Sequence, residues 1–130
     1  MGTPPALVGQ QEPIVYCLTR DRDLALAIDE RLVGSLVFFY NDTARLHQAV
    51  VLRAPDVVVI DSGAIKAEYG DAGLGPVVAF VRERAGTARI AVRPGPGGAE
   101  WLIGAEAGIG VVMLPGSGPE CAEAVAALSR

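Results

Sequence analysis

The chain has 130 residues, of which 51% are hydrophobic and only 5% aromatic, so its length and composition fit one domain with an aliphatic core. Its formal net charge is -4 and it has no basic stripe, which argues against nucleic acid or an anionic membrane as a partner. No apolar run reaches the ~18 residues of a membrane span. Cys17 and Cys121 lack the spacing of a metal site or a redox motif, which favours a cytoplasmic setting.

The N-terminal elements alternate between loop, strand and helix. Residues 1–13 have neither the basic start nor the apolar middle of a signal peptide, and we expect them to form a flexible lead-in. The first strand is predicted at Ile14 to Leu18, where a short apolar run precedes a charged segment. An amphipathic helix is expected to begin at a cap formed by Asp21 or Asp23 and to close at Gly34.

The middle of the chain contains the most apolar segment. Leu36 to Tyr40 is the second predicted strand, and the helix after it is expected to end before Pro55, which forces its predecessor out of the α region. Val57 to Ile60 is an unbroken apolar run without polar alternation, which indicates a central strand buried on both faces. Residues 62–75 are rich in glycine and are expected to be irregular.

The last third of the chain repeats the alternation of strand and helix. Its predicted elements are a helix at 76–85, a strand at 89–92, a short helix at 99–107, a strand at 111–114 and a helix opened by Pro119. Right-handed crossovers turn such an order into a doubly wound parallel sheet. We therefore predict a flavodoxin-like α/β fold over residues 14–130, with strand order 2-1-3-4-5 and helices on both faces.

Two segments resemble a known family. APDVVVIDSG, which contains Asp61 at the end of the predicted central strand, resembles the segment of response-regulator receiver domains that ends in the phospho-accepting aspartate. AEAGIGVVMLP resembles the stretch of the same family that runs through strand five to a Lys-Pro pair. The order and spacing of the elements agree with a receiver from about Ile14 to Arg130. The resemblance implies a signalling domain of a two-component system.

Most positions that carry receiver chemistry depart from the family pattern. Receivers hold Mg²⁺ between an acidic pair after strand one and the acceptor aspartate, while a Ser or Thr and a Lys contact the phosphoryl oxygens. At the matching positions stand Thr19 and Arg20 for the acidic pair, Arg93 for the Ser or Thr, and Leu114, before Pro115, for the lysine. The only lysine is Lys66, in the segment after Asp61. The resemblance is therefore to a degenerate receiver, a pseudo-receiver.

Asp61 allows more than one interpretation. In the preferred one, the guanidinium groups of Arg20 and Arg93 replace the metal ion beside Asp61, with Asp21 on the same rim of the sheet. The domain would then signal through protein contacts, with no metal, cofactor or enzymatic activity. In a second interpretation, Asp21, Asp23 and Asp61 form the shifted acidic site of a true phospho-accepting receiver. In a third, the strand ends bind a small molecule, as flavodoxin-like modules do.

A partner surface is predicted on the face made by residues 99–107, 111–114 and 119–128, which matches the usual contact surface of receivers. Helical residues step by ~100°, so three consecutive bulky residues at 101–103 cannot all face the sheet. The candidate contact residues are Trp101, Ile103, Met113, Ala122 and Ala126. The partner expected there is another signalling protein, an output domain or a second copy of the chain.

Overall fold

The computed structural model describes residues 12–70, 73–94 and 110–129 of the chain. They form a parallel sheet with the strand order β2-β1-β3-β4-β5, so the predicted flavodoxin-like α/β fold is confirmed. The strands are β1 (Ile14–Leu18), β2 (Leu36–Tyr40), β3 (Val57–Asp61), β4 (Arg89–Arg93) and β5 (Val112–Met113).

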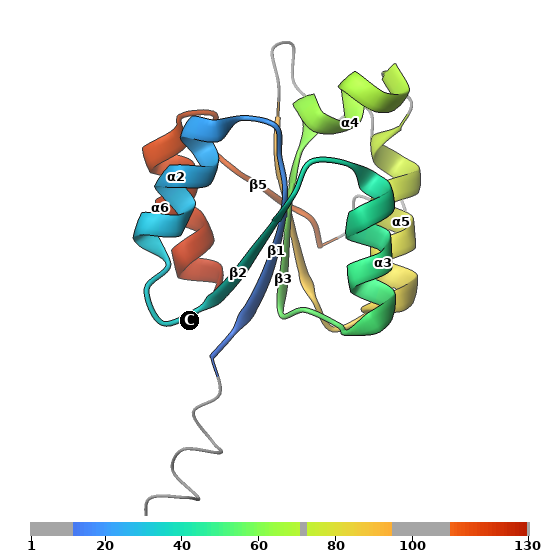
Figure 1. Ribbon diagram of the computed structural model, residues 1–130, viewed down its shortest axis with the longest axis horizontal. Coiled ribbons are helices and arrows are strands. Elements are labelled where there is room, and N and C mark those ends of the chain that lie inside the picture. Colours follow the sequence, from blue (N-terminus) through green and yellow to red (C-terminus); the bar gives the residue numbers. More distant parts are fainter. Residues whose placement is uncertain (1–11, 71–72, 95–109, 130) are drawn as a thin grey trace, which may run out of the picture.

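Helices cover both faces of the sheet, as Figure 1 shows. On one face, at the right of Figure 1, lie α3 (Thr43–Leu52), α4 (Ser62–Tyr69) and α5 (Leu74–Arg84). On the other face lie α2 (Arg22–Arg31) and α6 (Gly118–Leu128). No helix in the part of the chain that the structure describes has the length and apolar character needed to cross a membrane.

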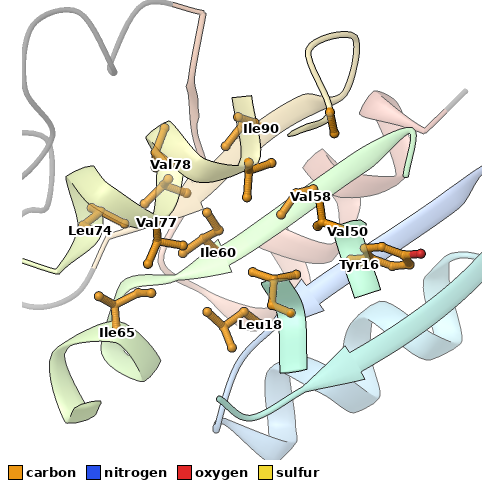
Figure 2. Packing of buried hydrophobic residues seen from close by; sticks show 14 of the residues in the cluster. Tyr16, Leu18, Val50, Val58, Ile60, Ile65, Leu74, Val77, Val78 and Ile90 are labelled. Atoms are coloured by element: carbon orange, nitrogen blue, oxygen red, sulfur yellow. The ribbon is translucent and has the colours of Figure 1, made fainter. Parts of the chain in front are cut away.

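The central strands explain why the sheet is stable. Every residue of β1 and β3 is buried, as the unbroken apolar run of β3 predicts for a strand covered on both faces. In Figure 2, Val58 and Ile60 of β3 point into the core under α4 and α5, where Ile65 and Val77 pack. Burying each such side chain contributes about 1.5–3 kcal/mol relative to leaving it in water.

The second core lies under α2 and α6. Its strand residues include Cys17 and Val59, and α6 contributes Cys121 and Val125. Alternate residues of a strand point to opposite faces, which is why Val58 and Val59 belong to different cores. Both thiols are therefore small core side chains, as the sequence predicts.

Side-chain caps fix where two of the helices begin. Asp21 accepts hydrogen bonds from the backbone N–H groups of Asp23 and Leu24 at the start of α2. Asp42 accepts one from the N–H of Arg45 at the start of α3. Beyond the end of α2, Gly34 has a φ of 92°, a conformation that favours glycine.

Some local expectations are wrong or fall outside the described residues. Ser62–Tyr69 forms α4, although the glycines of residues 62–75 predict an irregular segment. The helix begins directly after β3 because Ala64 and Ile65 have an apolar core to enter, and that burial outweighs the low helix propensity of glycine. The helix predicted at 99–107 lies outside the residues that the structure describes.

Candidate functional site

The carboxyl ends of β1, β3 and β4 bring Thr19, Asp61 and Arg93 to one rim of the sheet. Thr19 directly follows β1, while Asp61 and Arg93 are the last residues of their strands and are register partners. In doubly wound sheets, ligands and chemistry are located at this rim. The parallel register of β3 and β4 thus places a carboxylate beside a guanidinium, as predicted for Arg93.

Asp61 is nearly buried, with 7% of its surface exposed, and two side chains contact its carboxylate. Thr19 Oγ1 donates a hydrogen bond to Asp61 Oδ2 over 2.7 Å, and Arg93 Nη1 lies 3.5 Å from the same oxygen. The Thr19 hydroxyl also accepts a hydrogen bond of 3.0 Å from the backbone N–H of Asp21. Such partners are required, because an unpaired buried charge costs on the order of several kcal/mol.

Arg93 connects three segments of the chain. Its Nη1 atom donates to Asp21 Oδ2 over 2.9 Å, while Nε and Nη2 donate to the carbonyl oxygen of Gly116 over 3.0 and 2.8 Å. Burial lowers the pKa of Arg93, but the hydrogen bond to Asp21 and the charges of Asp61 and Asp21 together raise it above its usual value. The side chain is therefore a permanent cation between two acids.

Asp21 caps a helix and binds Arg93 at the same rim. The hydrogen bond from Arg93 lowers the pKa of Asp21, and the backbone N–H groups of Leu24 and Asp23 lower it further. Asp21 Oδ1 thus caps the start of α2, while Oδ2 binds the guanidinium of Arg93. A carboxylate that accepts charge-assisted hydrogen bonds stays ionised at neutral pH.

The two thiols lie beneath this charged cluster and are inert. Cys17 and Cys121 are free cysteines with no exposed surface. Burial, aided by the charge of Asp61, raises the pKa of Cys17. Burial raises the pKa of Cys121 to about 11, although the charge of Arg93 lowers it. Thiols whose pKa is raised by apolar surroundings are poor nucleophiles and poor metal ligands.

The position of the receiver lysine is occupied by an aliphatic side chain. Leu114 is 3% exposed, packs in the core under α2 and α6, and donates its backbone N–H to Val92 O over 2.8 Å. Pro115 follows on the surface. Lys66 is exposed on α4. No ammonium group therefore follows β5 at this rim.

The prediction that Arg20 pairs with Asp61 is wrong. Arg20 follows β1 at the expected rim, but its Nε atom donates to the carbonyl oxygen of Asn41 over 2.9 Å. Asn41 follows β2, whereas Asp61 belongs to β3, on the other side of β1. A side chain that leaves the end of β1 can turn toward either neighbouring strand, and the sequence does not determine which.

Of the described residues predicted to contact a partner, only some are exposed. Ala122 and Ala126 are 2% and 7% exposed, so the prediction that they meet a partner is wrong. They are buried because α6 packs against α2 as well as the sheet, which widens its buried arc. Met113 is 39% exposed on β5. Trp101 and Ile103 lie outside the described residues.

A cavity lies between α3, α4 and α5. It has a volume of about 400 Å³, and its walls include His47, Tyr69 and Phe80. The imidazole ring of His47 stacks on Phe80 with ring centroids 3.9 Å apart. Burial lowers the pKa of His47, although the charge of Glu68 raises it. His47 is thus half-buried in an apolar wall.

Sequence reasoning missed two contacts of the cluster. The comparison with receivers treats Thr19 only as a lost acidic ligand, yet its hydroxyl binds Asp61. The sequence does offer a signal for this contact, because a hydroxyl residue directly follows β1 and β1 is the neighbour of β3. The Gly116 carbonyl is a backbone acceptor, and the type of a residue does not predict that its carbonyl oxygen will bind a side chain.

The described residues contain no group of three or more His, Cys, Asp or Glu side chains that could hold a metal ion. What they bring together is a compact ionic cluster of Thr19, Asp21, Asp61 and Arg93 at the rim where this fold places its chemistry. Among known proteins, no family model, curated protein or solved structure matches the chain.

Proposed function

We propose that the chain is an atypical receiver-like signalling domain that acts through protein–protein contacts, without Mg²⁺-dependent phosphorylation of Asp61. One observation carries the proposal: the Arg93 guanidinium lies 2.9 Å from Asp21 and 3.5 Å from Asp61. A bound Mg²⁺ would need oxygens of these same carboxylates, because it prefers hard, anionic ligands. Arg93 therefore competes with a metal ion for both acids.

A phosphoryl group on Asp61 would also lack compensating charge. It would add a charge of about -1.5 to -2 beside Asp21, and Arg93 is the only cation that contacts either acid in the described part of the chain. Phosphoryl transfer depends on cations that neutralise the developing charge. Since Leu114 is aliphatic and buried, no lysine at β5 can contribute. These points support an ionic cluster that replaces the phosphorylation site.

If the domain signals without phosphorylation, its partner must recognise it through contacts with its surface. A cluster fixed by an internal cation favours one arrangement of the rim, so the domain would act as a constitutive binding module. Val112 and Met113, each 39% exposed on β5, are apolar residues on the predicted partner face. Another signalling protein or an output domain is the partner class that this proposal implies.

A phospho-accepting receiver is the second candidate, and one contact favours it. Asp21 and Asp61 bind the same nitrogen of Arg93, so the two carboxylates are close enough to share a cation. If Mg²⁺ displaced the guanidinium, the pair would resemble the acidic site of the family. Asp23 would be the third acid, and its backbone N–H already bonds to Asp21.

Incubation with acetyl phosphate and Mg²⁺, followed by intact-mass measurement, separates the two candidates. We expect no phosphoryl adduct on the wild-type chain. An adduct that disappears in the Asp61→Asn variant would refute the proposal in favour of the second candidate. A yellow colour or a co-purified nucleotide in the untreated protein would instead favour a small-molecule-binding module.

Metal binding by an arginine variant tests whether Arg93 is what keeps Mg²⁺ from Asp21 and Asp61. Removal of the guanidinium in Arg93→Ser should raise the affinity for Mg²⁺ about tenfold or more, a change of 1.4 kcal/mol, measured by titration calorimetry. The matched control is Arg89→Ser, at the opposite end of β4, where the guanidinium binds the carbonyl oxygen of Leu128. If both variants bind Mg²⁺ no better than the wild type, Arg93 is not what keeps the metal out.

A further inference from the structure

Within residues 12–70, 73–94 and 110–129, β2 is an edge strand without the usual protection of sheet edges. Natural edges are shortened, charged, interrupted by proline or a bulge, or covered by other segments. β2 has the same length as β1 and β3, its sequence LVFFY has no charge and no proline, and its register with β1 is continuous. It is also uncovered by the described residues, since Leu36, Phe38 and Phe39 are 43%, 46% and 37% exposed.

The backbone hydrogen bonds of β2 show which of its groups face outward. Leu36 donates its N–H to Pro13 O, and the carbonyl oxygen of Tyr40 accepts from Thr19, so these two residues face β1. Backbone groups alternate in direction along a strand. The N–H and C=O groups of Val37 and Phe39 therefore point away from the sheet, and no strand among the described residues pairs with them.

We propose that the outer edge of β2 pairs antiparallel with the same edge of a second copy of this chain, about a two-fold axis at Phe38. Val37 of each copy then stands opposite Phe39 of the other, and each such pair exchanges two hydrogen bonds. Phe38 stands opposite its own copy as a non-hydrogen-bonded pair, the kind whose side chains approach most closely. The two sheets become one continuous sheet.

Several observations favour a second copy over another occupant. The register above satisfies every outward group of Val37 and Phe39 with the matching groups of the same strand, which is the self-complementarity that a two-fold interface requires. The two-fold axis brings the Phe38 rings of the two copies together. It sets no like charges of β2 against each other, because β2 has no charged residue. An uncharged strand also offers no attraction to a basic or an acidic partner. The opposite edge is less suited, since β5 has only two residues.

The association should be weak and should strengthen with salt. A pair of five-residue strands is small compared with the ~800 Å² that each partner of a stable dimer buries. Each chain has a formal charge of -4, so screening by salt reduces repulsion between copies. Sedimentation velocity from about 10 μM to 1 mM should show a monomer–dimer equilibrium whose dissociation constant falls as NaCl is raised.

A cysteine placed at the axis tests the register. Paired residues of the non-hydrogen-bonded kind have Cα atoms ~4.5 Å apart, within the range that a disulfide spans. Phe38→Cys should therefore form a covalent dimer in a glutathione redox buffer, read on a non-reducing gel. Leu36→Cys is the matched control, because it is equally exposed on the same strand but lies opposite Tyr40 of the other copy. The native thiols are buried and should not contribute.

Charge placed at the axis tests the interface without cross-linking. Phe38→Lys sets two ammonium groups opposite each other and should raise the dissociation constant at least about tenfold. Val51→Lys adds the same charge at an exposed apolar residue of α3 and should leave the dissociation constant within about threefold of the wild-type value. Circular dichroism establishes that each variant is folded, since Phe38 also packs edge-on against Tyr16.

Three results would overturn the proposal. They are a wild-type chain that stays monomeric over the whole concentration range, a Leu36→Cys variant that cross-links as fast as Phe38→Cys, and a dimer that Phe38→Lys leaves intact. The inference does not rest on the function proposed for the Asp61 cluster. Phosphorylation of Asp61 would refute that function and leave the β2 pairing standing.

Discussion

Thr19 makes the shorter of the two side-chain contacts to Asp61 in the ionic cluster. Its hydroxyl donates to Asp61 Oδ2 and accepts from the backbone N–H of Asp21, so one oxygen links the buried carboxylate to the start of α2. Arg93 supplies charge, but its contact with Asp61 is the longer one, 3.5 Å against 2.7 Å. Thr19 is therefore the closer hydrogen-bond partner of Asp61.

The substitution Thr19→Val tests that contribution, because valine keeps the shape and removes the hydroxyl. A hydrogen bond to a charged group contributes about 1.5–3 kcal/mol, so we expect the free energy of unfolding to fall by about 2 kcal/mol. Urea denaturation followed by circular dichroism measures the change. Thr87→Val, in an exposed turn, is the control and should change stability by less than about 0.5 kcal/mol. An equal loss in both variants would contradict the assignment.

Residue-level reasoning from the sequence predicts the pairing of Arg93 with Asp61 correctly and that of Arg20 incorrectly, and the difference has a physical cause. Arg93 ends β4 and its register partner is Asp61 itself, so strand order alone brings the two together. Arg20 leaves β1 between two neighbouring strands, and its long side chain binds Asn41 instead. Strand order thus predicts which groups share a rim but does not determine the rotamer that a side chain adopts there.

At the scale of elements, the α4–α5 connection shows how close packing depends on one glycine. A Cβ atom built on Gly73 would lie 2.7 Å from both Ile65 Cγ2 and Tyr69 Cβ, closer than such atoms can approach. Gly73 precedes α5, so its lack of a side chain lets that helix start against α4. This contact also forms part of the wall of the cavity between α3, α4 and α5.

Gly73→Ala should therefore lower the free energy of unfolding by about 1–3 kcal/mol, the usual effect of overpacking. The control is Gly63→Ala in the first turn of α4, where the added methyl group would meet only Asp61 Oδ1 at 3.8 Å. Alanine favours helix there, and we expect no loss of stability. Thermal unfolding of both variants measures the two effects. A tolerated Gly73→Ala would show that α4 and α5 can move apart.

The elements themselves were predictable to different degrees. The β3 run is buried on both faces, and its composition alone indicates that position. α4 was missed because glycine at its second residue lowers helix propensity, whereas burial of Ala64 and Ile65 depends on a core that only the folded chain provides. The burial of Ala122 and Ala126 was missed for the same reason, since α2 lies beside α6 only after folding.

At the scale of the whole molecule, the two thiols report on global opening. Cys17 lies in β1 and Cys121 in α6, so both are covered by the same core and neither has exposed surface. Burial raises the pKa of both thiols, which keeps them protonated at pH 8 in the folded state. Their reaction with a thiol reagent requires that this core opens.

We expect neither cysteine to react with Ellman's reagent in the native protein at pH 8, and both to react together when urea unfolds the chain. In the folded protein the reaction rate should follow the population of the open state. The Cys121→Ala variant identifies which thiol reacts first. Rapid labelling of Cys121 alone in native buffer would contradict this expectation and would mean that α6 detaches while the sheet stays intact.

Asp61 is at once the last residue of β3 and the residue that precedes α4, so strand and helix meet at a joint without a linker. The Asp61 carboxylate makes no cap hydrogen bond to α4, so β3 and α4 are joined here through the backbone alone. α4 in turn holds the start of α3 through Glu68, which accepts from the N–H of Thr43 over 2.8 Å. The backbone from the end of β3 is therefore continuous with a helix that is hydrogen-bonded to the start of α3, in the layer opposite α2.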